Sequence, residues 1–372
     1  MNIAINTRLL IKDELEGIGR FSFEIIKRIV KQHPNINFHL IFDRPFSKNF
    51  LFSENVKGHV IRPKTRHPVI WYYWFEFQIP KLLKKINANL FISLDGFLTS
   101  KLNIPKINVV HDINFEHRPK DLPFLYQKYY RHFIPKYCKI SNEIITVSNF
   151  SKNDISKTYK ISKNKIHVVY NGVSENFNTE DKYTEKIKKK FTKGYDYFVF
   201  IGSLHKRKNI SRMLKAFDLF KKQTKSKMKF LIVGKKRWWS NEMEKTYKNM
   251  SYNKDVIFTG YVSEIFLNSI IKEAKCLCFV SLFEGFGLPI IEAMKCGTPV
   301  ITSNVSSMPE ICGDSGLIVD PLNVIEIANA MQKIKNDKNL CNKLIESGIK
   351  RSQIFNWNES AKNFSKVIEK YI

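Results

Sequence analysis

The stretch EGFGLPIIE, from Glu284 to Glu292, comes soon after the apolar run CLCFV at 276–280. This order predicts a buried strand, a tight loop and the start of a helix. Gly285 and Gly287 allow the backbone to turn and to approach a ligand closely. Pro289 suits the first helical position because it has no N–H group to leave unpaired. The free N–H groups at such a helix start would face an anion.

The two carboxylates of this stretch, Glu284 and Glu292, can flank one polar ligand if the second lies about one turn into the helix. The pattern therefore predicts a phosphate at a helix tip with hydroxyl groups on either side, as in a nucleotide sugar. A strand, loop and helix with Gly and Glu also occurs in many α/β proteins without a site. A second motif is needed to decide between these interpretations.

That second motif is GSLHKRKN, from Gly202 to Asn209, which follows the apolar run YFVFIG at 197–202. It precedes an amphipathic helical pattern, which places Arg207 and Lys208 at the carboxyl edge of a sheet, where open α/β folds bind ligands. In a chain with 50 lysines, adjacent cations can also be a solvated basic turn. The two motifs together favour a site.

Seven segments in order make the chain resemble the retaining glycosyltransferases of family four (glycosyltransferase group 1), which have the GT-B fold. They are GIGRFSFEI (17–25), VVHDINFEHRP (109–119), ITVSNFSKNDI (145–155), VVYNGVSENF (168–177), GSLHKRKN (202–209), EGFGLPIIE (284–292) and GTPVITSNVSSMPEICGDSGLIVDP (297–321). The resemblance covers nearly the whole chain. It is nearest to mannosyltransferase-like members that build bacterial surface polysaccharides.

The resemblance implies transfer of a hexose from a nucleoside diphosphate sugar to a sugar hydroxyl, with the anomeric configuration retained. It implies that Arg207 and Lys208 bind the diphosphate, that Glu284 holds the donor sugar and that His111 contacts this sugar from the other domain. The implied donor-binding residues are Gly17, Gly19, Gly202, Phe286, Gly287, Leu288 and, on the ribose, Glu292. No protein nucleophile is implied, because a phosphate oxygen of the donor would deprotonate the acceptor. Many relatives carry Arg where this chain has Ser203, so the diphosphate charge would rest on Arg207 and Lys208 alone.

Apolar, strand-like runs alternate with helical patterns along the chain, which predicts α/β architecture with two doubly wound parallel sheets. The runs lie near 2–6, 38–42, 89–94, 106–110, 143–148 and 165–170 in the first half, and near 195–201, 228–233, 255–259, 276–280, 299–302 and 316–319 in the second. We expect an acceptor-binding Rossmann-like domain at 1–180, a nucleotide-sugar-binding Rossmann-like domain at 181–355, and a helix at 356–372 that packs back on the first domain. In a GT-B fold the two domains face each other across a cleft that holds the active site. The lysine-rich span Thr179 to Lys193 is expected to be the linker.

The formal net charge of +28 is spread over both halves, +13 for residues 1–186 and +15 for residues 187–372. This even spread argues against a basic nucleic-acid-binding tail. Lysine supplies 50 of the 62 cations, which indicates an AT-rich genome as one cause of the charge; the other interpretation is weak attraction to an anionic membrane surface, which suits a lipid-linked acceptor. The aromatic stretch IWYYWFEFQIP (70–80) is either a lipid-facing patch or, more commonly for Trp71, Trp74, Phe75 and Gln78 at helical spacing, part of the core. No run approaches the roughly 20 apolar residues that span a bilayer. The expected location is cytoplasmic, peripheral on the inner face of the plasma membrane.

No cofactor and no metal are expected, because the chain has no DxD pair to hold a divalent ion on a diphosphate. The six cysteines form no CxxC pair and are expected to be reduced. Two alternatives stay open. An NAD-dependent oxidoreductase would share the sheets, but GIGRFS lacks the third glycine of the dinucleotide fingerprint. A nucleic-acid-binding protein would explain the charge but should concentrate it on one face.

Overall fold

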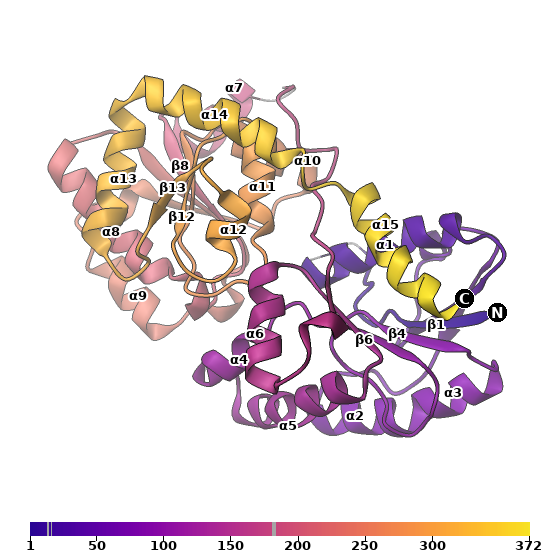
Figure 1. Ribbon diagram of the computed structural model, residues 1–372. Coiled ribbons are helices and arrows are strands. Elements are labelled where there is room, and N and C mark those ends of the chain that lie inside the picture. Colours follow the sequence, from indigo (N-terminus) through magenta and orange to yellow (C-terminus); the bar gives the residue numbers. More distant parts are fainter. Residues whose placement is uncertain (13–14, 16, 181–183) are drawn as a thin grey trace. The chain divides into compact units, whose positions relative to one another are not determined.

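The computed structural model divides into two compact units, shown in Figure 1. Unit 1 comprises Met1–Gly172 together with Asn356–Ile372, and unit 2 comprises Val173–Phe355. The structure describes residues 1–12, 15, 17–180 and 184–372. The chain thus crosses between the units at 172/173 and again at 355/356, rather than at the expected 180/181.

Unit 1 is built on a seven-stranded sheet in the order β3-β2-β1-β4-β5-β6-β7, with every pair parallel. The strands are β1 (Asn2–Asn6), β2 (Asn37–Phe42), β3 (Val56–Val60), β4 (Leu90–Ser93), β5 (Lys106–Val109), β6 (Glu143–Thr146) and β7 (Ile166–Val168). The apolar runs predicted six of them. The edge strand β3, VKGHV, was missed because Lys57, Gly58 and His59 interrupt any apolar run.

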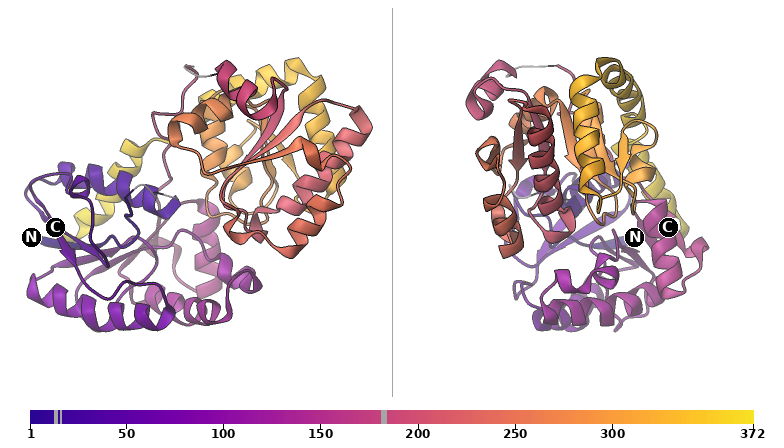
Figure 2. Two further views of the ribbon diagram at one scale, coloured as in Figure 1. Left: turned by 180° about the vertical axis from the view of Figure 1, so that it is seen from behind. Right: turned by 90° about the vertical axis from the view of Figure 1, so that its left-hand side faces the viewer.

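Helices cover both faces of this sheet (Figure 2). They are α1 (Gly17–Gln32), α2 (Pro68–Tyr73), a π-helical turn (Trp74–Gln78), α3 (Ile79–Lys85), α4 (Asn114–His117), α5 (Phe124–Ile140), α6 (Asn149–Tyr159) and the C-terminal α15 (Trp357–Ile368). Helix α15 packs against α1, and α2 packs against α5. The parallel sheet is thereby buried on both faces, as parallel strands require.

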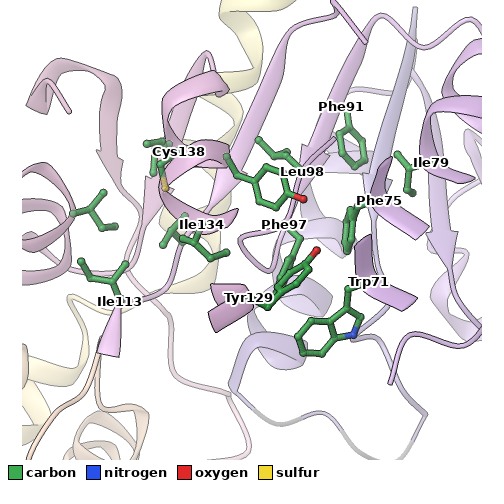
Figure 3. Close-up of a cluster of buried hydrophobic side chains, with 14 of the residues drawn as sticks. Trp71, Phe75, Ile79, Phe91, Phe97, Leu98, Ile113, Tyr129, Ile134 and Cys138 are labelled. Atoms are coloured by element: carbon green, nitrogen blue, oxygen red, sulfur yellow. The ribbon is translucent and has the colours of Figure 1, made fainter. Parts of the chain in front are cut away.

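An aromatic-rich core fills the space between the sheet of unit 1 and the layer formed by α2, α3 and α5 (Figure 3). Trp71 and Phe75 from the helical layer meet Phe97 from the loop after β4, with ring centroids 5.4 Å apart in both pairs. Tyr129 on α5 joins them, 5.5 Å from Trp71. Burial of such large rings is a main source of the stability of this layer.

Unit 2 repeats the plan with a six-stranded sheet in the order β10-β9-β8-β11-β12-β13, again with parallel pairs. The strands are β8 (Tyr197–Ile201), β9 (Lys229–Val233), β10 (Val256–Gly260), β11 (Cys276–Phe279), β12 (Val300–Ser303) and β13 (Leu317–Val319). All six apolar runs expected in this half are strands. The neighbouring ends of β8 and β11 are the part of the sheet that matters for the site.

The helices of unit 2 are α7 (Thr184–Thr192), α8 (Ile210–Thr224), α9 (Asn241–Lys248), α10 (Glu264–Glu273), α11 (Leu288–Lys295), α12 (Met308–Cys312), α13 (Val324–Asn336) and α14 (Lys338–Ser352). Helix α8 packs against α9 and α13, and α11 packs against α14 and α10. Figure 1 shows these two groups on opposite faces of the sheet. Unit 2 is therefore also a doubly wound, Rossmann-like fold.

The span Thr179 to Lys193 is not a simple linker. Most of it forms α7, which packs against α10 of unit 2, while residues 181–183 lie outside the described part of the chain. Ile187 is buried, and Lys188 forms ion pairs with Asp196 and Glu273. This amphipathic helix was not predicted, because its apolar stripe is short and most of its other residues are lysines.

Three further observations concern the described residues. No helix among them is long and apolar enough to cross a membrane. All six cysteines are free thiols, and five of them are buried. Within the described ranges, no three His, Cys, Asp or Glu side chains are grouped so that they could hold a metal ion.

Candidate functional site

The basic turn after β8 is held in place from both sides. The chain leaves the strand at Gly202, whose φ of +142° favours glycine. A short 3₁₀ turn at Lys206–Lys208 follows, capped by the His205 side chain, whose Nδ1 accepts a hydrogen bond from the Arg207 N–H at 3.3 Å. Asn209 then adopts a left-handed conformation with φ of 61° and immediately precedes α8.

The Asn209 carboxamide connects this turn to the segments that follow β11 and β13. Its Nδ2 donates to the Val280 carbonyl at 3.0 Å and to the Pro321 carbonyl at 2.7 Å. The Leu282 N–H in turn donates to the Arg207 carbonyl at 2.7 Å. These bonds fix the basic turn against the loop that follows β11, so the two sequence motifs form one structural unit.

The centre of this unit is an ion-pair cluster of Arg207, Lys208 and Glu284. Arg207 Nη1 lies 2.7 Å from Glu284 Oε2, and Lys208 Nζ lies 2.6 Å from Glu284 Oε1. Arg207 Nη1 also donates to the Phe283 carbonyl at 3.1 Å, and Lys208 Nζ lies 4.8 Å from the centre of the Phe279 ring. The cluster carries two positive charges and one negative charge.

Glu284 is ionised in this setting although it is only 6% exposed. Burial by itself would raise the pKa of the carboxyl, but the charges and hydrogen bonds of Arg207 and Lys208 outweigh it and lower the pKa to about 2. The carboxylate is therefore a weak base. It serves to orient the two cations rather than to accept a proton.

Two serines that the sequence motifs did not single out support the Glu284 loop. Ser306 Oγ accepts a hydrogen bond from the Glu284 N–H at 3.0 Å, and Ser306 itself has a φ of 55°. The buried Ser307 donates its hydroxyl proton to the carbonyls of Glu284 and Phe286, at 2.9 and 2.8 Å. Both serines precede α12, within the stretch at 297–321 whose residues had no assigned roles. A side chain that supports a distant loop leaves no local signal in the sequence.

The helix start predicted after Gly287 is present. Gly287 precedes α11 with a φ of +108°, and a Cβ there would lie 3.1 Å from Ile290 Cδ1. The helix begins at Leu288, so Pro289 is its second residue rather than its first. Glu292 is half-buried on this helix, four residues beyond Leu288. Phe286 is buried, and its ring meets Phe355 edge-on at 5.6 Å.

Gly202 and Gly234 bring the ends of β8 and β9 close together. A Cβ at Gly234 would lie 2.0 Å from the Gly202 carbonyl oxygen, so no larger residue fits without a shift of the backbone. The carboxyl edge of the unit 2 sheet therefore presents backbone, the Arg207 and Lys208 cations and the start of α11 around one area.

In unit 1, the His111 side chain packs against helix α1. His111 follows β5, and its Nε2 lies 3.0 Å from the Leu94 carbonyl, beyond β4. Since a carbonyl only accepts, Nε2 carries the proton, and Nδ1 of the neutral ring is left as an acceptor. The ring meets Phe21 of α1 edge-on at 5.0 Å. Burial is the largest cause that lowers the pKa of His111.

Gly17 and Gly19, the glycines of the expected glycine loop, belong to α1, the helix that also carries Phe21. Gly17 is the first residue of α1, with a φ of +28°. A Cβ at Gly19 would lie 2.8 Å from the Leu9 carbonyl oxygen, so glycine allows the loop after β1 to pack directly on α1. The resemblance assigns Gly17 and Gly19 to donor binding and His111 to the donor sugar, and in unit 1 the His111 ring contacts Phe21 of the helix that begins at Gly17.

A buried ion pair beside these residues was missed. Arg8 follows β1 and Asp95 follows β4, and Arg8 Nε lies 2.5 Å from Asp95 Oδ2. Asn6 Nδ2 donates to Asp95 Oδ1 at 2.8 Å, and the Arg8 guanidinium lies 4.8 Å from the centre of the Phe97 ring. A charged residue two positions after the end of each of two strands was the available signal, but neither residue belonged to a recognised motif.

The chain matches two sequence families of known proteins. Residues 15–177 match the profile described as Glycosyltransferase Family 4, and residues 181–351 match Glycosyl transferases group 1. Similar proteins include the O-antigen chain mannosyltransferase B of Escherichia coli, 26% identical over 88% of this chain and 89% of that protein. The O-antigen chain mannosyltransferase RfbU of Salmonella typhimurium is 27% identical over 72% of this chain and 71% of that protein.

The fold is also shared with solved structures. HepE of Anabaena, crystallised with UDP and glucose, superposes with a TM-score of 0.77 at 15% identity, covering 100% of both chains. Two Rossmann-like parallel-sheet units of this kind are the GT-B architecture. Because the two profiles together account for nearly all of the chain, this protein belongs to the glycosyltransferases of group 1 and family 4, with the GT-B fold.

Proposed function

We propose that this glycosyltransferase moves mannose, or a closely similar hexose, from a nucleoside diphosphate sugar to a sugar hydroxyl of a glycan or lipid-linked acceptor, with the anomeric configuration retained. The observation that carries the proposal is the Arg207–Glu284–Lys208 cluster at the carboxyl edge of the unit 2 sheet. GDP-mannose is the first donor to test. No cofactor is needed in this scheme.

The charge of the cluster suits a diphosphate leaving group. As the glycosidic bond of the donor breaks, negative charge builds on the diphosphate. Arg207 and Lys208 leave one net positive charge after pairing with Glu284, and the free N–H groups at the start of α11 add a partial positive charge. Each charge-assisted hydrogen bond to the diphosphate contributes about 1.5 to 3 kcal/mol. In this proposal, Gly202, Phe286, Gly287 and Leu288 supply the close backbone approach.

The carboxylates position the donor in this proposal. With a pKa near 2, Glu284 is too weak a base to deprotonate an acceptor. Its role is to hold the cations and the hydroxyls of the donor sugar, while Glu292 binds the ribose. The acceptor proton goes to a phosphate oxygen of the donor, so no protein nucleophile takes part. The pair thus differs from the acid and nucleophile of a glycoside hydrolase.

In unit 1, we assign the glycine loop at Gly17 and Gly19 to the donor and His111 to the transferred sugar. Neutral His111 offers Nδ1 as an acceptor for a hydroxyl group, because its Nε2 proton is engaged by the Leu94 carbonyl. Burial, which lowers the pKa of His111, favours this neutral form.

The names of the relatives support the choice of sugar and pathway class. The two proteins described above, from E. coli and S. typhimurium, are both named O-antigen chain mannosyltransferases. A mannosyl donor and an acceptor in surface polysaccharide synthesis are therefore the first substrates to test.

A donor screen tests the proposal directly. The protein is incubated with GDP-mannose, UDP-glucose, UDP-N-acetylglucosamine or dTDP-sugars, with a saccharide acceptor mixture, and the released nucleoside diphosphate is measured. We expect release from GDP-mannose and little from the others. Because the chain lacks a DxD pair, the rate should be the same in excess EDTA as in magnesium. Release from a different donor alone, or activity that only Mg²⁺ or Mn²⁺ restores, would overturn the corresponding part of the proposal.

A further inference from the structure

The helical segment formed by α2, the π-helical turn and α3 has two different faces. Its inner face carries Trp71, Phe75 and Ile79, which are buried in the core of unit 1 (Figure 3). Trp74 belongs to the same buried cluster. Its outer face carries large apolar side chains that remain in contact with solvent: Val69 (69% exposed), Tyr72 (41%), Tyr73 (44%) and Phe77 (45%). The core interpretation of this aromatic stretch is thus confirmed for the inner face, whereas the lipid-facing interpretation stays a prediction for the exposed outer face.

The exposed rings form a continuous patch. Tyr73 stacks on Phe77 with centroids 5.9 Å apart, and Tyr72 lies 6.0 Å from Phe77. Tyr72 also reaches across to Phe133 on α5, at 5.5 Å. In a regular α-helix, residues five positions apart point about 140° away from each other. The π turn at Trp74–Gln78 reduces this angle, which lets Phe77 contact both tyrosines.

Cations continue this face along α3. Lys81, Lys84 and Lys85 are exposed one and two turns beyond Phe77. The fully described segment 62–85 contains six Lys and Arg residues and one carboxylate, Glu76. Glu76 is 3% exposed and accepts hydrogen bonds from Ser100, so it does not offset the surface charge.

The neighbouring helix has the same character. Helix α5 contains no Asp or Glu, and its exposed cations are Lys128, Arg131, Lys136 and Lys139. Lys136 Nζ lies 5.8 Å from the centre of the Phe133 ring, at the border of the patch. Some exposed lysines elsewhere are paired with acids, as Lys248 is with Glu244 and Lys222 with Asp218.

We propose that this aromatic–basic face, Val69, Tyr72, Tyr73 and Phe77 with Lys81, Lys84 and Lys85, binds the surface of an anionic phospholipid bilayer. Aromatic rings partition into the headgroup region, and lysines beside them attract anionic lipid headgroups. A second copy of the chain is a poor occupant, because a self-complementary contact would bring two sets of lysines together. The proposal goes beyond sugar transfer and does not depend on the donor or the acceptor.

Vesicle flotation tests the proposal with the full chain and without any sugar donor. Vesicles of phosphatidylcholine alone are compared with vesicles that also contain phosphatidylglycerol. We expect binding to the anionic vesicles that weakens as salt is added. Two triple variants address the face. The first removes its aromatic rings and combines Tyr72→Ser, Tyr73→Ser and Phe77→Ser. The second reverses its charges and combines Lys81→Glu, Lys84→Glu and Lys85→Glu. Each should weaken binding at least about tenfold.

Matched variants in unit 2 control for overall charge and hydrophobicity. The first control changes three exposed apolar residues and combines Phe266→Ser, Ile318→Ser and Ile325→Ser. The second changes three exposed lysines and combines Lys335→Glu, Lys338→Glu and Lys343→Glu. Both controls should bind vesicles within about threefold of the unmodified protein. Circular dichroism confirms that each variant is folded.

Several outcomes would overturn the proposal. They are no binding of the unmodified protein to anionic vesicles, unchanged binding in both variants of the face, or equal losses in the matched controls. Binding of a single-stranded RNA oligonucleotide that the face variants abolish, while vesicle binding persists, would assign the face to nucleic acid instead. Loss of self-association in the face variants with intact vesicle binding would assign it to a second copy.

Discussion

Lys208 Nζ lies 2.6 Å from Glu284 Oε1, although the two residues come from loops after different strands. Arg207 holds the other oxygen of the same carboxylate. Because one buried acid orients two cations, their positions are set before any ligand arrives. Such preorganisation is what stabilises developing charge on a diphosphate without further rearrangement.

The two carboxylates of the EGFGLPIIE stretch should have separable roles. If Glu292 binds ribose, Glu292→Gln should weaken binding of the nucleoside diphosphate about tenfold or more, because one acceptor becomes a donor. Glu284→Gln removes the carboxylate that orients Arg207 and Lys208 but keeps both cations, so it should change that affinity less than Glu292→Gln does and should mainly slow transfer from the intact donor. Calorimetry with the diphosphate and turnover assays measure the two effects.

The control for both carboxylates is Glu242→Gln, which changes an exposed carboxylate on α9. It should alter neither quantity. Equal weakening of diphosphate binding by Glu284→Gln and Glu292→Gln, or the reverse order, would show that the two ends of the stretch contact other parts of the donor.

The low pKa of Glu284 predicts how stability depends on pH. A carboxyl whose pKa falls from 4.5 to about 2 on folding contributes stability that is complete above 4.5. This contribution is lost as the pH falls towards 2. Between about pH 5 and about pH 3, the unmodified protein should therefore lose about 2 kcal/mol more than Glu284→Gln does. Urea unfolding at several pH values measures this difference. An identical acid dependence of the two proteins would mean that the ion pairs do not form in solution.

His111 should affect the transfer step and not the binding of the diphosphate. His111→Ala should lower turnover at least about tenfold, the loss expected for one hydrogen bond to the reacting sugar. The diphosphate affinity should stay unchanged. Because burial lowers the pKa of His111, the ring stays neutral above its ordinary pKa of about 6.5, and turnover should not fall from its protonation in that range. His132→Ala, at an exposed position on α5, is the control. Equal turnover of the two variants would remove His111 from the reaction.

Much of the fold could be predicted because its signals are local. Runs such as YFVFI and CLCF are fully buried strands, and their alternation with helical patterns indicated parallel sheets. The edge strand β3 and the helix α7 were missed because Gly58 and many lysines break up their short apolar patterns. Both are stabilised by neighbours that are distant in the sequence.

The site followed the same division. The placement of Arg207, Lys208, Glu284 and the start of α11 could be predicted, because each lies at a strand end or a glycine turn, and their role in binding stays a prediction. Ser306 and Ser307 could not be predicted, since their hydroxyls support a loop that lies 22 and 23 residues earlier in the sequence. The Arg8–Asp95 pair was missed for a similar reason, because β1 and β4 become neighbours only in the folded sheet.

The most direct test of the account is turnover of Lys208 variants. Lys208→Met keeps an unbranched apolar side chain over Phe279 but removes the charge, and Arg207 remains to pair with Glu284. Lys206→Ala changes the exposed lysine in the same turn and serves as the control. We expect Lys208→Met to lower turnover with the best donor at least about a hundredfold, a loss of about 2.7 kcal/mol, and Lys206→Ala to remain near normal. Near-normal turnover of folded Lys208→Met would show that the cluster is a structural ion pair and not the diphosphate site.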